Sequence, residues 1–121
     1  MTKAKALKDL LAKVEAGELK KWHEALAIGL FPDDRHILLM SAYGGSLDAA
    51  KALHEVVLPG GIVAGMIMWD DLCRVELAQT HERDGDVWHG SSDLASIGEC
   101  DDLARAWLIA ILKALIAEEE K

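Results

Sequence analysis

The chain has 121 residues, 51% of them hydrophobic, and a formal net charge of -8 at pH 7. This length predicts a single domain over residues 1–121, and the hydrophobic content is enough for a core that needs no disulfide, metal or cofactor. Phosphate backbones repel an acidic chain that lacks a basic stripe, so direct nucleic-acid binding is disfavoured. No apolar run reaches the ~18 residues of a membrane span, and the N-terminal lysines precede no apolar signal core. We therefore expect a cytoplasmic protein with no membrane partner.

Two N-terminal helices are predicted within residues 1–31. The first covers residues 3–14, where leucines and a valine recur at helical spacing with lysines on the other side. The second covers residues 19–30, where apolar side chains recur at four-residue steps. The sequence FPDD breaks the chain at residues 31–34. The apolar run 37–40 that follows is short enough for either a strand or irregular structure.

A helix over residues 47–57 begins the main part of the predicted core, which we place at residues 42–118. Apolar side chains recur on one face of this helix, and charged side chains occupy the other. The sequence LPGG ends the helix, because proline and glycine continue a helix poorly.

Three strands follow, joined by short turns. The first covers residues 62–69. Asp70-Asp71 turns the chain into the second strand, residues 72–80, where apolar and charged side chains alternate. Asp84-Gly85 is a strong hairpin signal, and the third strand covers residues 86–89 with an extension to residue 97. Consecutive strands joined by short turns form an antiparallel meander.

The last helix is predicted at residues 102–118, with Asp101 as its cap, and it is apolar almost all the way round. Such a helix is buried on more than one side. One sheet face cannot cover it, so we expect a homodimer through this helix. The fold class is therefore α+β: a three-stranded antiparallel sheet sandwiched between helices (α-β-α), with an N-terminal helical segment and a long apolar C-terminal helix.

Two segments of the predicted core carry a resemblance to a known family. YGGSLDAA begins at residue 43 and ARAW at residue 104, and both resemble motifs of the phage ABA sandwich family, which consists of small phage and prophage proteins. The matching residues are Tyr43, Ser46, Leu47, Asp48, Ala49, Ala50, Ala104, Arg105, Ala106 and Trp107. The resemblance spans residues 42–118 and implies a sheet covered by helices on both faces. It implies no activity and supplies no catalytic residues.

Gly44, Gly45 and Ser46 form a candidate anion site, because amide groups at a helix N-terminus bind phosphates. The alternative is a helix start in which Ser46 is the N-cap and Asp48 faces the positive end of the helix dipole. The spacing fits neither a P-loop nor a dinucleotide-binding fingerprint, and Asp48 would repel a phosphate. We therefore expect a helix cap.

The hairpin 81–89 is a second candidate site, because it groups residue types that bind metals and perform acid–base chemistry. These residues are His81, Glu82, Asp84, Asp86 and His89. With a turn at residues 84–85, His81 pairs near Trp88, which places His81 and His89 on opposite faces. We therefore expect a solvated hairpin tip and no metal.

Acidic and apolar side chains supply candidate contacts for a protein partner. The candidate acids lie at element boundaries, where carboxylates suit turns and caps, and they are Asp33, Asp34, Asp70 and Asp71. Met66, Met68 and Trp69 favour a place in the core, with a contact face for a partner as the alternative. Cys73 and Cys100 have no metal-binding spacing, so we expect reduced thiols.

Two functions from different classes agree with these features. The first is a phage- or prophage-encoded, non-catalytic binding protein that occupies a host protein or protein complex and antagonises host defence, for example a CRISPR effector. The second is a small-molecule or nucleotide-binding module, or a minor enzyme, built at the glycine loop or the 81–89 hairpin. A virion accessory protein is a further alternative. Because the sequence has no catalytic constellation, we expect the first function and no enzyme.

Overall fold

The protein is described by a computed structural model that covers residues 2–19, 29–32, 34–58, 61–81 and 89–120. Its elements are α1 (Lys3–Glu15), α3 (Arg35–Tyr43), α4 (Leu47–Val57), β1 (Gly61–Met68), β2 (Cys73–His81), β3 (His89–Cys100) and α5 (Leu103–Glu119). The predicted α+β class and the three-stranded antiparallel sheet are confirmed. Among the described helices, none is long and apolar enough to cross a membrane.

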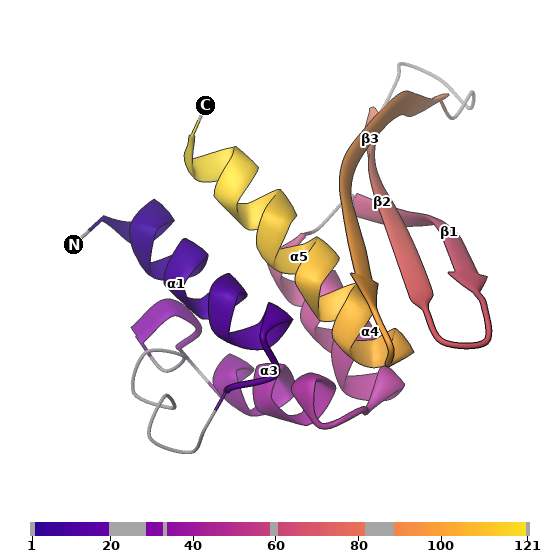
Figure 1. The fold of residues 1–121 in the computed structure, drawn as a ribbon. Helices are drawn as coiled ribbons and strands as arrows, with labels where there is room; N and C mark the ends of the chain where they lie inside the picture. Colours follow the sequence, from indigo (N-terminus) through magenta and orange to yellow (C-terminus); the bar gives the residue numbers. More distant parts are fainter. Residues whose placement is uncertain (1, 20–28, 33, 59–60, 82–88, 121) are drawn as a thin grey trace.

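The sheet, in the order β1-β2-β3, is covered on one face by α5, which packs against β2 and β3. The helices α1, α3 and α4 pack against α5 on its side away from the sheet, so the described helices are all on one side of the sheet rather than on both faces (Figure 1). The sequence of β2 explains this cover. Cys73, Val75 and Leu77 are buried. Arg74 and Glu76 alternate with them, point to the opposite face and form an ion pair (Nε–Oε1 3.2 Å).

The helix α5 is the centre of the core. Its buried residues run from Ala104 to Ile116 and lie on all sides of the helix, which confirms that it is buried on more than one side. The helix begins one residue later than predicted, because Asp102 rather than Asp101 is the N-cap: its Oδ1 accepts from the Arg105 amide at 2.9 Å. The sheet and three helices of the same chain contact α5, which accounts for the burial of its apolar residues.

The backbones of β3 and α5 approach closely at Gly98. A Cβ atom placed on Gly98 would overlap the Ala106 carbonyl oxygen and lie 2.5 Å from the Ala110 nitrogen. Nearby, the Ser96 hydroxyl donates to the Ala110 carbonyl at 2.6 Å. Small residues on both elements therefore set the spacing between the sheet and its helix.

One element of the described chain differs in type from its prediction. The apolar run 37–40, expected as a strand or irregular structure, lies inside the helix α3. Leu39 and Ala42 are its buried residues, and their three-residue separation is helical spacing. The apolar run 37–40 is too short to show this spacing. The predicted helix at residues 19–30 lies largely outside the described residues.

Candidate functional site

The glycine loop joins α3 to α4. The amides of Gly44, Gly45 and Ser46 donate to carbonyl oxygens in the last turns of α3 at 3.0–3.1 Å. Gly45 has a φ of +107°, and the bonds from Gly45 and Ser46 form the Schellman pattern that ends many helices. A Cβ on Gly45 would lie 3.4 Å from the Asp102 carboxylate. The three amides that an anion would need are thus bonded to α3, and a negative charge lies beside them.

Ser46 is the N-cap of α4, as predicted. Its hydroxyl oxygen accepts a hydrogen bond from the Ala49 amide at 3.1 Å, and Asp48 lies in the first turn. The hydroxyl pairs one of the amides that lack a partner at the helix start, and the Asp48 carboxylate complements the positive end of the helix dipole.

Ser46→Ala is expected to lower the free energy of unfolding by about 1 kcal/mol, because it removes this cap. Urea denaturation followed by circular dichroism measures the change. Ser41→Ala, at an exposed position within α3, is the matched control and is expected to leave the stability nearly unchanged. Equal midpoints for the two variants would show that the cap contributes nothing.

The two segments that carry the family resemblance meet in space. The Arg105 guanidinium stacks on the Tyr43 ring, 4.2 Å from its centroid. Its Nε and Nη2 also donate to the Tyr43 carbonyl at 3.3 and 3.1 Å. Arg105 therefore joins the start of α5 to the end of α3, and these motif residues serve the fold.

A buried polar pair joins α4 to α5. The Trp107 indole Nε1 donates to His54 Nδ1 at 3.0 Å, with the ring planes at 75°. Because Nδ1 accepts this bond, the neutral imidazole carries its proton on Nε2. His54 is 4% exposed, and its Nε2 has no hydrogen-bond partner in the described part of the chain. The two residues are 53 positions apart, and the sequence gave no sign of their contact.

The 81–89 hairpin lies mostly outside the described residues. The register pairs His81 with His89, where the sequence led us to expect His81 opposite Trp88. Residues 82–88 are not described, so the candidate metal-binding acids Glu82, Asp84 and Asp86 have no position here. Across the ranges that are described, no group of three or more His, Cys, Asp or Glu side chains is placed to hold a metal.

The described candidate acids lie in two separate places. Asp33 is outside the described residues. Asp34 is exposed, has a φ of 68° and precedes α3 without a side-chain capping bond. Asp70 and Asp71 are exposed at the tip of the β1–β2 hairpin, on the other side of the molecule from the start of α3 (Figure 1). These acids therefore do not form one continuous surface.

An apolar strip adjoins the hairpin acids. We call it the 66–69 strip: Met66, Ile67, Met68 and Trp69, which are 41%, 38%, 67% and 50% exposed. The predicted core position of Met66, Met68 and Trp69 is wrong. In the described sheet β1 is an edge strand, and α5 packs against β2 and β3, so its cover ends before the outer strand.

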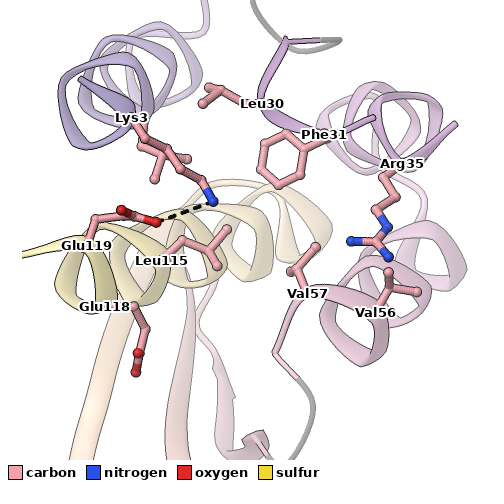
Figure 2. A pocket seen from close by; sticks show the side chains of 10 residues that line it. Lys3, Leu30, Phe31, Arg35, Val56, Val57, Leu115, Glu118 and Glu119 are labelled. Carbon is pink, nitrogen blue, oxygen red and sulfur yellow. Dashed lines mark ion pairs between the residues drawn. The ribbon is translucent and has the colours of Figure 1, made fainter. Parts of the chain in front are cut away.

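A small cavity lies between α1, α4 and the end of α5 (Figure 2). Leu7, Phe31, Val57 and Leu115 supply apolar walls. Lys3 forms an ion pair with Glu119 (Nζ–Oε1 3.3 Å) at one side of the cavity, across from Arg35 (Figure 2). The volume is about 170 Å³, whereas ligand pockets usually measure roughly 300–1,000 Å³. A nucleotide is therefore too large for this cavity.

Comparison of the chain with protein-family models, with curated proteins and with solved structures finds no match.

Proposed function

We propose that this protein is a non-catalytic binding domain that recognises a protein partner through the 66–69 strip and the adjoining acids Asp70 and Asp71. The observation that carries the proposal is the exposure of four consecutive large apolar side chains. Met66 and Met68 lie on the face of Val75 and Cys73, and Ile67 lies on the face of Arg74, so the strip presents apolar side chains on both faces of one sheet edge. Isolated exposed apolar residues are ordinary, but such a run of them is typical of an interaction surface.

The backbone of β1 adds hydrogen-bonding capacity to this surface. An edge strand leaves amide and carbonyl groups of one side available to a further strand. Residues 65–68 pair with β2 without a break in register, so their outer edge is regular. The whole of β1, GIVAGMIM, carries no charged residue that would repel an added strand. An extended segment of the partner can therefore pair with β1.

The charge beside the strip limits the chemistry of the partner. Asp70 and Asp71 follow the strip directly, and the chain carries a net charge of -8. The partner segment that pairs with β1 is expected to have apolar residues along its length. It is expected to have Lys or Arg where it reaches the tip of the β1–β2 hairpin. Such charges accelerate association and select partners more than they add affinity.

We further propose that the partner is a host protein or protein complex whose occupation antagonises host defence, for example a CRISPR effector. This part rests on the resemblance to phage proteins and on the acidic charge. A virion accessory role is the alternative, and copurification with phage particles would favour it.

Replacing both Met68 and Trp69 with serine is expected to reduce the recovery of a specific partner from host lysate by thirtyfold or more. Large aromatic anchors at interfaces contribute about 2 kcal/mol or more each when truncated, which is roughly thirtyfold in affinity. Quantitative pull-down with mass spectrometry measures the recovery.

The matched control is Ile37→Ser, which removes an equally exposed apolar side chain from α3. Its partner recovery is expected to equal that of the wild type. The double variant Asp70→Asn, Asp71→Asn is expected to weaken recovery at low salt and much less at high salt. Equal recovery from all four proteins would refute the proposed surface.

A further inference from the structure

The sheet places the two cysteines opposite each other. In the β2–β3 register, Cys73 is the partner of Cys100, and both thiols are free. Directly opposed residues of antiparallel strands have Cα atoms about 4.5–5.5 Å apart and side chains on the same face. Disulfides need a Cα separation of about 4.4–6.8 Å. The register therefore satisfies the backbone requirement for a cross-strand disulfide.

Both sulfur atoms also converge on one residue. The Cys100 Sγ donates to Asp101 Oδ1 at 3.3 Å, and the Cys73 Sγ lies 3.9 Å from the Asp101 carbonyl oxygen. Cys73 is buried and Cys100 is half-buried. One thiol is thus reachable from solvent, and the other is buried directly opposite it on the neighbouring strand.

We propose that Cys73 and Cys100 form a redox-modification site that closes to a reversible disulfide when the protein meets a hydroperoxide. This site is independent of the function proposed above. The Cys100 thiolate attacks the outer peroxide oxygen, the O–O bond breaks, and an alcohol or water leaves after protonation. Cys100 is then a sulfenic acid. The Cys73 thiol attacks its sulfur, the S–S bond forms, and the sulfenic hydroxyl leaves as water with the Cys73 proton. Two thiols lose two electrons and two protons, and the peroxide is reduced by two electrons.

The surroundings of Cys100 make the first step slow at neutral pH. Burial has the largest effect and raises the pKa of the Cys100 thiol above its usual value. The Asp102 amide opposes this rise, and the hydrogen bond to the Asp101 carboxylate, which has a smaller effect than the amide, adds to it. Only a small fraction is therefore thiolate, which is the reactive form. The site responds to sustained oxidant exposure, and its rate rises with pH.

Treatment of the native protein with hydrogen peroxide tests the proposal. The expected product has lost two hydrogen atoms by intact mass, yields a Cys73–Cys100 linked peptide after digestion, and returns to the starting mass with dithiothreitol. The rate of closure is expected to increase between pH 7 and pH 9. In Cys73→Ser the reaction is expected to stop at a Cys100 sulfenic acid, which dimedone traps.

Two outcomes would overturn the inference. One is a wild-type protein in which dimedone captures Cys100 quantitatively while no linked peptide forms. The other is a disulfide that appears only between two chains. Should the Cys73→Ser protein unfold, the wild-type reaction in urea is the control: loss of the strand register is expected to shift the product from disulfide to dimedone adduct.

Discussion

Gly98→Ala is expected to lower the free energy of unfolding by roughly 3 kcal/mol, the upper range for overpacking a core. The new methyl group would overlap the Ala106 carbonyl oxygen and lie 2.5 Å from the Ala110 nitrogen. Both obstacles are backbone atoms of α5, so no side-chain rotation relieves the overlap. The strand and the helix must separate, and the contacts of β3 with α5 loosen along their length.

Chemical denaturation of Gly98→Ala against the wild type measures this loss. Gly29→Ala is the matched control, because a Cβ there meets nothing within 4 Å, and it is expected to be neutral or slightly stabilising. A Gly98→Ala protein as stable as the Gly29→Ala protein would mean that β3 and α5 do not approach as closely as described.

Ile111→Ala is expected to cost about 2–5 kcal/mol of unfolding free energy. Ile111 lies in the middle of α5 and is fully buried, so truncation leaves a cavity where the helix is surrounded on all sides. Thermal and urea unfolding measure the loss.

The control is Ile37→Ala, which deletes the same atoms at a position that is 53% exposed. It is expected to change the stability by less than about 0.5 kcal/mol. Similar losses for the two isoleucine variants would contradict the central position of α5 in the core.

The sequence predicted well those elements whose ends are marked by capping or turn residues. The helix α4 was predicted at residues 47–57 and is observed at Leu47–Val57, because Ser46 caps its start and proline and glycine follow its end. The strands were located to within a few residues, since the alternation in β2 and the Asp70-Asp71 turn are features of neighbouring residues. Each of these signals consists of a few neighbouring residues in the sequence.

Contacts between distant segments were not predictable in the same way. Gly98, Ala106 and Ala110 are all visible in the sequence, but only the packed fold shows that they oppose one another. The contact of Arg105 with Tyr43 likewise joins residues that are 62 positions apart. A pattern within a single element does not say which surfaces of two elements will meet.

In the candidate sites, too, features set by neighbouring residues were predictable and features set by distant segments were not. The Ser46 cap was predicted because capping is local. The bonding of the loop amides depends on α3, which was not predicted as a helix, so the anion site was rejected on other grounds. The exposure of the 66–69 strip depends on β1 being an edge strand, and an apolar run looks the same in an edge strand and in a central one.

The helix α5 is central to the core but late in the chain, and this combination affects folding during synthesis. The helices α1, α3 and α4 and the strands β2 and β3 all contact α5, yet it is the last of the described elements to be made. Until residues 103–119 have left the ribosome, the earlier elements lack the partner on which they pack. The decisive folding step is therefore late, and it joins segments far apart in sequence, which slows folding and leaves the apolar sheet face exposed to chaperones in the meantime.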